Sequence, residues 1–399
     1  MTPIPADWTL KALGDVARVY SGGTPNRMVP SYWDGTIPWV STAEIGTSAI
    51  MTTRETISRS GLENSATRIA PAGTLLMAMY GQGKTRGKTS ILGIDAAMNQ
   101  ACAAIEPGSE VDSTYLLAYL QCNYDFIRSL SNAGGQENLS GEIVKRIPVI
   151  LPPFREQVAI GSAYQLAASL VDGLEGLLAK KQAIKQGMMQ QVFRNRADSE
   201  LSPIGSVTSW MSGGTPDRSI ESYWTGTIPW ISAATLKKVE VSDSDQKVSA
   251  LGVQAGSKMA PLGSTLVLVR GSALHSEIRA SLVIAPVCFN QDVKALVPSA
   301  KVVPKFLTYS IHGNANRLLS LVTSAGNTAG VLDTGVLKSF NIWLPDCDEQ
   351  KRVVAMFDDV TGDLDLLSKR LIKAKSIQQG MMQELLAGRT RLPVTGATA

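Results

Sequence analysis

Two long stretches of the sequence carry apolar residues at spacings of three and four, the pattern of an amphipathic helix. The first follows Pro153 and continues without proline to Phe193, and the second follows Pro345 and continues to Leu386. Each apolar stripe is narrow, so it predicts a seam against another helix rather than a face buried in a broad core. The predicted seam is Ile160, Ala163, Ala167, Leu170, Leu174, Leu177, Ile184 and Met188, interrupted at Lys181, and Phe357, Val360, Leu364, Leu367, Leu371, Ala374, Met381 and Leu385, interrupted at Gln378.

The whole pattern occurs twice, because the chain is a tandem duplication. Ser-Gly-Gly-Thr-Pro at 21–25 returns at 212–216, and Gly-Thr-Ile-Pro-Trp at 35–39 returns at 226–230, both at an offset of 191. Farther along, Glu-Gln at 156–157 and Gln-Gly-Met-Met-Gln at 186–190 return at 349–350 and 379–383, at an offset of 193. The two copies therefore differ in length by only a two-residue insertion or deletion between these motifs. A repeat of this length indicates duplicated domains rather than a solenoid.

The part of each copy before its long helix has the pattern of a mixed α/β globular region. Short apolar runs bounded by glycine or proline predict strands at 37–41, 74–79, 101–105 and 145–151, whereas residues 113–130 have helical spacing. The predicted fold class is α+β. We expect globular regions at 1–147 and 199–340, and long helical regions at 148–198 and 341–399, the last including a tail.

Chain direction predicts how the two long helices pair. The first leads from one globular region to the other, and the second begins where the second globular region ends, so packed seams require antiparallel helices. The chain would then imitate a symmetric dimer with a pseudo-two-fold axis. Roughly 30 ordered helical residues would separate the globular regions by about 45 Å, more than the roughly 34 Å of one DNA turn. Such a rod could act as a ruler.

Composition adds limits without identifying a partner. Lysine and arginine number 38 against 34 acidic residues, and a net charge of +4 permits a polyanionic partner without requiring one. The apolar runs are too short to span a membrane, and the N-terminus lacks a secretion signal, so we expect a cytoplasmic protein with reduced thiols. No paired spacing suggests a zinc site among Cys102, Cys122, Cys288, Cys347, His275 and His312.

These motifs, taken as an ordered double set, resemble the specificity subunits of Type I restriction-modification systems. The resemblance covers nearly the whole chain and rests on Ser-Gly-Gly-Thr-Pro, Gly-Thr-Ile-Pro-Trp, Leu-Pro-x-x-x-Glu-Gln and Gln-Gly-Met-Met. It implies two target recognition domains, each reading one half of a bipartite site in double-stranded DNA. It also implies that the helices dock two methyltransferase subunits, which use S-adenosylmethionine, and that a motor-nuclease subunit using ATP and magnesium can join. Gly173 and Gly176 lie in the middle of the first long helix, where each glycine costs about 1 kcal/mol of helix stability relative to alanine. The stiffness of the rod there is therefore in question.

Three motifs imitate catalytic sites, but each lacks a residue that its chemistry requires. Gly-Gln-Gly-Lys-Thr at 81–85 resembles the end of a P-loop, yet Ala78 stands where that motif needs glycine. Leu151-Pro-Pro-Phe resembles an amino-methyltransferase motif, but leucine cannot accept a hydrogen bond from the target amino group. The nuclease-like order of Asp346 and Glu349 is better explained as a helix capping box. We expect no catalytic residue, no metal and no cofactor in this chain.

Segments that differ between the copies are the predicted carriers of sequence preference. Two windows stand out, 44–68 against 235–258 and 80–98 against 270–289. Arginine and lysine read guanine or contact phosphate, and glutamine reads adenine. The candidate DNA-contact residues are Arg54, Arg59, Gln82, Lys84, Arg86 and Lys88 in the first copy, and Lys237, Lys238, Lys247, Gln254, Arg270, His275 and Arg279 in the second.

Several alternatives stay open. Lys84, Arg86 and Lys88 alternate, so an extended segment would project them from one face, but a solvated basic loop also fits. Trp33, Trp39, Trp224 and Trp230 could stack on bases, although their recurrence beside Ile-Pro favours core packing. Two other functions compete with DNA reading by a non-catalytic subunit. They are a protein-interaction scaffold without a DNA role, and a self-sufficient methyltransferase or nuclease.

Overall fold

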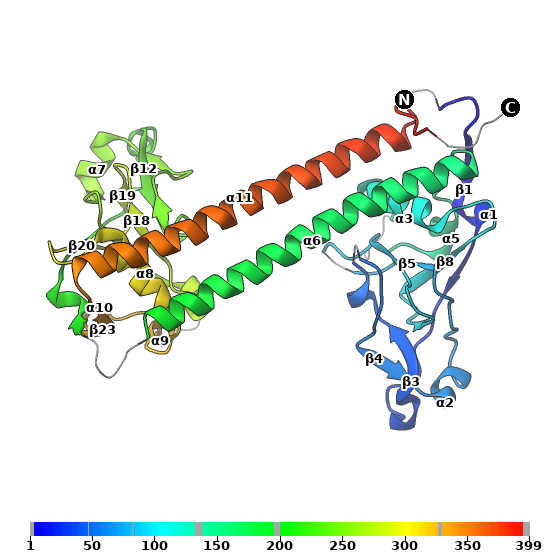
Figure 1. Ribbon diagram of the computed structural model, residues 1–399, viewed down its shortest axis with the longest axis horizontal. Helices are drawn as coiled ribbons and strands as arrows, with labels where there is room; N and C mark the ends of the chain where they lie inside the picture. The colour runs from blue at the N-terminus through cyan, green and yellow to red at the C-terminus, as the bar shows by residue number, and fades with distance from the viewer. Residues whose placement is uncertain are drawn as a thin grey trace. The chain divides into compact units, whose positions relative to one another are not determined.

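The computed structural model describes residues 4–46, 48–81, 83–131, 138–194, 200–325 and 329–393, and the chain forms two compact units. Unit 1 comprises residues 1–175 and 369–399, and unit 2 comprises residues 176–368. Two long helices, α6 (Phe154–Val192) and α11 (Cys347–Leu386), each contribute one half to each unit. These are the green and the orange-to-red helices of Figure 1. The sequence-predicted helices are therefore confirmed to within a residue at each end.

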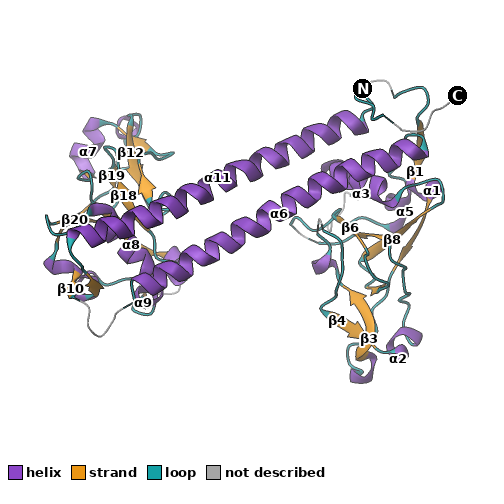
Figure 2. Ribbon diagram, viewed as in Figure 1, coloured by secondary structure: helices purple, strands orange, loops and turns teal. Residues whose placement is uncertain are grey.

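Unit 1 is a mixed α/β region in which three small sheets pack against short helices (Figure 2). The largest sheet has the order β2-β8-β5-β6 and is antiparallel throughout. A second has the order β4-β3-β7, with β3 and β7 parallel, and a third pairs β1 with β9. The strands are β1 (Thr9–Ala12), β2 (Ala17–Ser21), β3 (Trp33–Val40), β4 (Glu55–Ile57), β5 (Leu75–Ala78), β6 (Thr89–Ile91), β7 (Ala97–Met98), β8 (Cys102–Pro107) and β9 (Pro148–Leu151).

The helices of unit 1 complete its core. The predicted helix at 113–130 is two helices that break at Asn123. The buried face of α3 packs with Ile160 and Tyr164 of α6 and with Met382 of α11 in one hydrophobic cluster. The long helices are thus part of the globular core and not a separate rod in this unit. The helices are α1 (Leu13–Val16), α2 (Arg59–Glu63), α3 (Ser113–Cys122), α4 (Tyr124–Ser129) and α5 (Gly141–Lys145), with 3-10 turns η1 (Pro30–Tyr32) and η2 (Thr42–Glu44).

Unit 2 repeats this plan. Its main sheet has the order β11-β20-β16-β18-β13, and smaller sheets have the orders β14-β12-β19-β15, β17-β22-β21 and β10-β23. The strands are β10 (Leu201–Pro203), β11 (Thr208–Ser212), β12 (Ile228–Ile231), β13 (Glu240–Val241), β14 (Lys247–Val248), β15 (Lys258–Met259), β16 (Thr265–Leu268), β17 (Arg270–Gly271), β18 (Ala280–Val283), β19 (Cys288–Phe289), β20 (Val293–Pro298), β21 (Thr323–Ala325), β22 (Ala329–Val331) and β23 (Asn341–Trp343).

The helices of unit 2 pack around an aromatic cluster. Phe193 at the end of α6 lies between Phe306 of α8 and Phe357 of α11, with ring centroids 5.4 and 6.0 Å away. All three side chains are fully buried. The helices are α7 (Ala250–Gly256), α8 (Pro304–Gly313), α9 (Ala315–Leu319) and α10 (Thr334–Ser339), with 3-10 turns η3 (Ile204–Ser206), η4 (Glu221–Tyr223) and η5 (Ser272–His275).

Within each unit, α6 and α11 run antiparallel. In unit 2, Lys181 pairs with Asp363 at 2.9 Å, and farther along α6 Phe193 stacks on Phe357, so the partner number falls as the α6 number rises. In unit 1, Glu175 of α6 forms an ion pair with Lys375 of α11, so the two helices are also in contact there. The predicted α+β fold class with two antiparallel long helices is therefore confirmed.

The predicted seam of α6 is wrong at three positions. Leu170, Leu177 and Ile184 are 59%, 44% and 50% exposed, whereas Val171 is 8% exposed. The buried stripe steps from Ile160 to 164 and 171 rather than to 163 and 170, because Tyr164 packs into the core of unit 1. Leucine or isoleucine occupies these three positions next to the seam. The apolar pattern of the sequence therefore could not show which helix positions face the other helix. The other predicted seam residues of the two helices, Leu174, Met188, Leu364, Leu367, Leu371 and Met381, are buried or half-buried.

Candidate nucleic-acid interface

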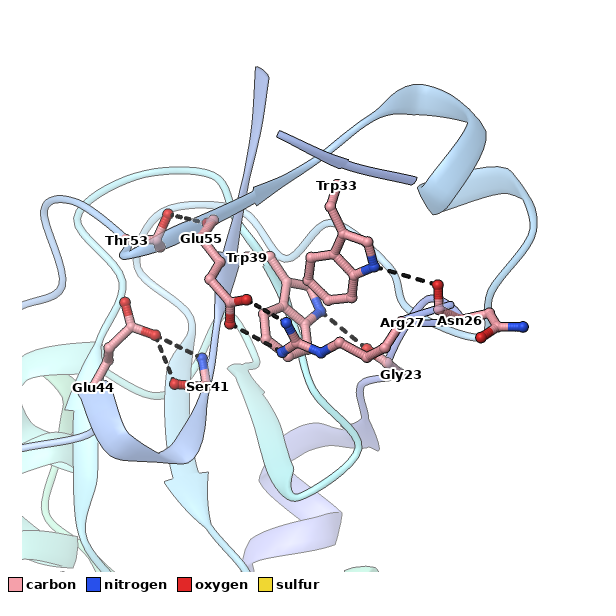
Figure 3. Close-up of polar contacts among 9 residues, drawn as sticks. All are labelled: Gly23, Asn26, Arg27, Trp33, Trp39, Ser41, Glu44, Thr53 and Glu55. Carbon is pink, nitrogen blue, oxygen red and sulfur yellow. Dashed lines mark hydrogen bonds and ion pairs between the residues drawn. The ribbon is translucent and has the colours of Figure 1, made fainter. Parts of the chain in front are cut away.

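A cluster of one arginine and two tryptophans occupies the same place in each unit. In unit 1 the Arg27 guanidinium lies 3.9 Å from the Trp33 ring centroid, and the Trp33 and Trp39 rings meet edge to face at 5.2 Å (Figure 3). Trp39 Nε1 donates to the Gly23 carbonyl at 3.1 Å. A Cβ on Gly23 would lie 2.4 Å from a backbone nitrogen, at Thr67, which explains the second glycine of Ser-Gly-Gly-Thr-Pro.

The arginine–tryptophan cluster of unit 2 has the same geometry. The Arg218 guanidinium lies 4.7 Å from the Trp224 ring and 5.3 Å from the Trp230 ring, and the two rings are again 5.2 Å apart. Trp230 Nε1 donates to the Gly214 carbonyl at 3.1 Å. Trp39 and Trp230 are almost wholly buried, in line with core packing.

The two clusters differ at one strand position. In unit 1, Glu55 on β4 lies opposite Trp39 and forms a two-pronged ion pair with Arg27, with one N–O distance of 3.0 Å (Figure 3). These hydrogen bonds raise the pKa of Arg27 and hold that of Glu55 below its ordinary value. In unit 2, Gln246 stands opposite Trp230. Among the described residues, no carboxylate lies within ion-pair distance of Arg218.

A cavity of about 770 Å³ opens beside Arg218 in unit 2. Its wall includes Lys237 and Lys238, two of the predicted DNA-contact residues, and Asn290 of the repeated Asn-Gln pair. The acidic side chains at its edge are partly neutralised within the unit. Asp243 pairs with Lys247 at 3.2 Å, and Glu240 pairs with a lysine of α8 at 2.6 Å. The wall is therefore of mixed charge: it has three cations, Arg218, Lys237 and Lys238, and three acids, Glu240, Asp243 and Asp245, two of which are held by lysines outside the wall. The three cations could meet a polyanion.

The first copy's candidates occupy different surroundings from those expected. The idea that Lys84, Arg86 and Lys88 share one face of an extended segment is wrong, because residues 83–87 form a turn. Gly81, Gly83 and Gly87 all have positive φ, which bends the backbone away from a strand. Arg86 is 4% exposed and points into the interior, so it is not a surface contact, whereas Lys84 is exposed and Lys88 half-buried. Arg54 and Arg59 are exposed, Arg59 in an ion pair with Glu63; Gln82 lies outside the described residues.

The second copy's candidates are mostly on the surface. The exposed residues are Lys237, Lys238, Lys247, Gln254, Arg270 and His275. Arg279 differs, because its side chain is mostly buried, pairs with Glu277 and donates to the Ala233 carbonyl at 2.6 Å. Arg279 thus braces the loop that leads into Lys237. Lys237 and Lys238 are the candidates that the structure brings together with Arg218.

Sequence reasoning missed two kinds of residue that the repeat itself marks. Arg27 and Arg218 recur at the offset of 191, but they lie in the shared scaffold and not in the divergent windows. Gln157 and Gln350 recur in the Glu-Gln motif without an assigned role. Both are buried amides that join the start of a long helix to the loop ahead of α3 or α8.

The predicted cap of the second long helix is present. Asp346 Oδ1 accepts from the backbone N–H groups of Asp348 at 3.0 Å and Glu349 at 2.8 Å. Glu349, predicted as the second half of a capping box, instead pairs with Arg352. Helix capping therefore explains Asp346 alone, and Glu349 forms a surface ion pair.

The described residues lack two kinds of feature. None of the helices there combines the length and the apolar character needed to cross a membrane. In the same part of the chain, no three His, Cys, Asp or Glu side chains gather as metal ligands would.

Comparison with known proteins identifies the family. The model described as Type I restriction modification DNA specificity domain matches residues 5–165 and again residues 197–376. These two matches cover most of the chain. The chain belongs to this family.

Individual relatives are distant. The chain is 28% identical to the Type I restriction enzyme EcoR124I/EcoR124II specificity subunit of Escherichia coli over 192 residues, 47% of this chain and 48% of that protein. The aligned part thus spans about half the length of that relative. The chain is also similar to the Type I restriction enzyme MjaVIII specificity subunit of Methanocaldococcus jannaschii, at 19% identity. This alignment is longer and covers 98% of this chain and 94% of the MjaVIII subunit.

A solved structure shares the fold. It comes from work on complex assembly and conformational transition of the type I R-M system, and it matches with a TM-score of 0.60. The match covers 97% of this chain and 100% of that one at 17% identity. At this identity the likeness supports the fold alone.

Proposed function

We propose that this chain is the DNA-reading, non-catalytic specificity subunit of a Type I restriction-modification complex, and that each unit reads one half of a bipartite site. The observation that carries the proposal is the duplicated scaffold. The same glycine-tryptophan packing holds both units, while the segments next to it differ in charge and sequence. Shared packing positions two readers, and unlike segments give them different preferences.

The partner subunits are part of the same proposal. Leucine and isoleucine side chains stand exposed on the long helices, where neither the seam nor a globular core covers them. In α6 they are Leu166, Leu170, Leu177 and Ile184, and in α11 they are Leu366, Ile372 and Ile377. Exposed apolar side chains on a helix face suit a protein partner. We assign these faces to two methyltransferase subunits, which would supply S-adenosylmethionine, and a motor-nuclease subunit using ATP and magnesium could join that assembly.

Such a chain would work in the cytoplasm, where it meets DNA, and the two helices would set the spacer between the half-sites. This chain would supply sequence preference, and the methyl transfer would take place on its partners.

The test is a map of genomic methylation in the native host with and without the gene. We expect a two-part methylation mark that disappears on deletion. Replacing residues 1–147 with the globular region of another family member should change one half-site and leave the other unchanged. A methylation map that is identical with and without the gene would contradict DNA reading and favour a scaffold without a DNA role.

A further inference from the structure

We propose that Arg218 contacts hydrogen-bond acceptors of the target DNA in the half-site read by unit 2, and that Glu55 withholds Arg27 from the same contact in unit 1. The inference rests on the proposed function and adds a residue that determines how the two halves differ. The shared chemistry of the ligand is an acceptor on DNA, either a phosphate oxygen or the N7 and O6 edge of guanine.

The two arginines differ in whether a carboxylate takes up their N–H donors. When a guanidinium stacks on a tryptophan ring, the attraction acts through the flat face of the guanidinium. Its N–H groups point outward in the plane and stay available for hydrogen bonds. In unit 1, Glu55 takes up two of these donors in an end-on pair, one from each terminal nitrogen of Arg27. In unit 2 the residue opposite Trp230 is Gln246, just before β14, and Arg218 keeps a similar stacked position with no carboxylate partner among the described residues.

The cavity beside Arg218 has two lysines that the first copy lacks. Lys237 and Lys238 line it beside Arg218, whereas the aligned positions of the first copy, 46 and 47, are glycine and threonine. The segment that carries the two lysines is anchored to the core of unit 2. Glu240, which follows them, pairs with Lys305 at 2.6 Å, and Lys305 also pairs with Asp358 of α11 at 2.8 Å. The ion pairs of Glu240 therefore hold the segment that carries the two lysines, and these lysines occur only in the second copy.

Asn290 lines the same cavity and is 7% exposed. Its Oδ1 has no hydrogen-bond partner among the described residues, and the Nδ2 contact to Asp292 at 3.4 Å fixes which way the amide faces. The matching Asn99 of unit 1 is satisfied, because its Oδ1 accepts from the backbone N–H of Ala101 at 3.1 Å. A buried acceptor without a partner is costly, and a donor brought by a bound ligand or its water would satisfy it.

The experiment exchanges the residues that distinguish the two units. Gln246→Glu gives Arg218 the carboxylate that Arg27 already has, in a backbone setting that unit 1 shows to be stable. Arg218→Lys keeps the charge but loses the planar fork, and Glu55→Gln is the matched control in the other unit. Each full-length variant replaces the native gene in the host, and its complex is purified with whatever subunits accompany it.

Two readouts follow, the methylation map of the host and the affinity of the complex for duplex DNA that carries the mapped site. We expect Gln246→Glu to weaken binding about 5- to 100-fold, and Glu55→Gln to leave the unit 2 half-site unchanged. A guanine contact predicts relaxed preference at one position of that half-site. A phosphate contact predicts a uniform loss and a salt dependence shallower by about 0.9 in log–log slope.

The outcomes separate the two hypotheses. If the wild-type gene leaves no methylation mark and the complex binds no duplex, the proposed function fails. If the wild-type complex reads its site while Gln246→Glu and Arg218→Lys bind as tightly, with the same preference and the same salt dependence, the assignment of Arg218 is wrong and the proposed function stands. Thermal melting of each variant checks that the fold is intact, and Arg218→Lys decides the matter if Gln246→Glu unfolds unit 2.

Discussion

The buried glutamine at the start of α11 is a sharp test of how the repeat holds its helices. Gln350 is fully buried and makes three hydrogen bonds. Its Oε1 accepts from the Val303 backbone N–H at 2.8 Å, and its Nε2 donates to the carbonyls of Lys301 at 3.0 Å and Pro345 at 2.8 Å. One side chain therefore ties the helix start to the loop that leads into α8.

Replacing Gln350 with Met keeps the size and removes all three bonds. The Val303 N–H is then buried without an acceptor, which costs about 1–3 kcal/mol, and each carbonyl loses a donor. We expect a loss of about 2–4 kcal/mol in the free energy of unfolding, a large part of the roughly 5–15 kcal/mol typical of a domain. Gln350→Glu should cost more, because it places a carboxylate oxygen against two carbonyl oxygens in a buried site.

Hydrogen exchange of the full chain, followed by mass spectrometry, locates the effect. Gln350→Met should speed exchange at the Val303 amide and in the first turn of α11, and Gln157→Met should do the same at Asp112, whose N–H the Gln157 Oε1 accepts at 3.0 Å. Gln190→Met, at an exposed position of α6, is the control for the change of residue type. The reasoning is refuted if Gln350→Met unfolds within 0.5 kcal/mol of the wild type, about the size of an ordinary surface effect, and leaves Val303 protected.

Three further predictions concern pH, helix stiffness and the seam. Burial holds the pKa of His312 below its ordinary value of 6.5, so the unfolded chain takes up the proton first and the stability of unit 2 falls as pH drops below about 6.5. His312→Gln should remove this loss, and urea unfolding at pH 5 and pH 7.5 that shows the same pH difference in both proteins would contradict it. A Cβ on Gly173 or Gly176 meets nothing within 4 Å, so alanine at either position should raise the free energy of unfolding by about 1 kcal/mol. The melting temperature should rise, and a lower melting temperature would count against a continuous, uncrowded helix. Val171→Ala should cost about 1–2 kcal/mol and Leu170→Ala less than about 0.5 kcal/mol in chemical unfolding, and the reverse order would restore the seam predicted from sequence.

The sequence was sufficient for the features that periodicity encodes directly. Repeated motifs at offsets of 191 and then 193 defined the two copies, and long runs without proline defined both long helices. Asp346 was recognisable as a cap because its side chain acts within its own turn. The four strands predicted from short apolar runs were present as β3, β5, β8 and β9, although β9 begins at Pro148 and the predicted first residue, Lys145, ends helix α5.

Other features depend on which segments meet in three dimensions. The phase of the α6 seam depends on the packing of Tyr164 in unit 1, which spacing along one helix does not reveal. The turn at 83–87 depends on positive φ angles at three glycines, so the basic residues there do not alternate. Arg27 meets Glu55 only because β3 and β4 are paired, and residues so far apart in sequence give no local sign of the contact.

Comparison of the two copies separates residues that hold the backbone from residues that meet a ligand. Gln121 Nε2 donates to the Thr89 carbonyl at 2.7 Å in unit 1, and at the same places in unit 2 His312 Nε2 donates to the Ala280 carbonyl at 2.9 Å. The residue type changed, but the hydrogen bond to the backbone did not, so this position serves the fold.

At positions 55 and 246 the opposite holds. The backbone at this place lies beside the inner tryptophan in both units, but the exchange of glutamate for glutamine removes an ion pair and leaves Arg218 beside a cavity that also contains Lys237 and Lys238. A substitution that preserves the scaffold and changes only the charge available at the surface is the kind expected where duplicated domains have acquired different ligands. This is why a change at 246 should alter one half-site, whereas a change at His312 should alter stability alone.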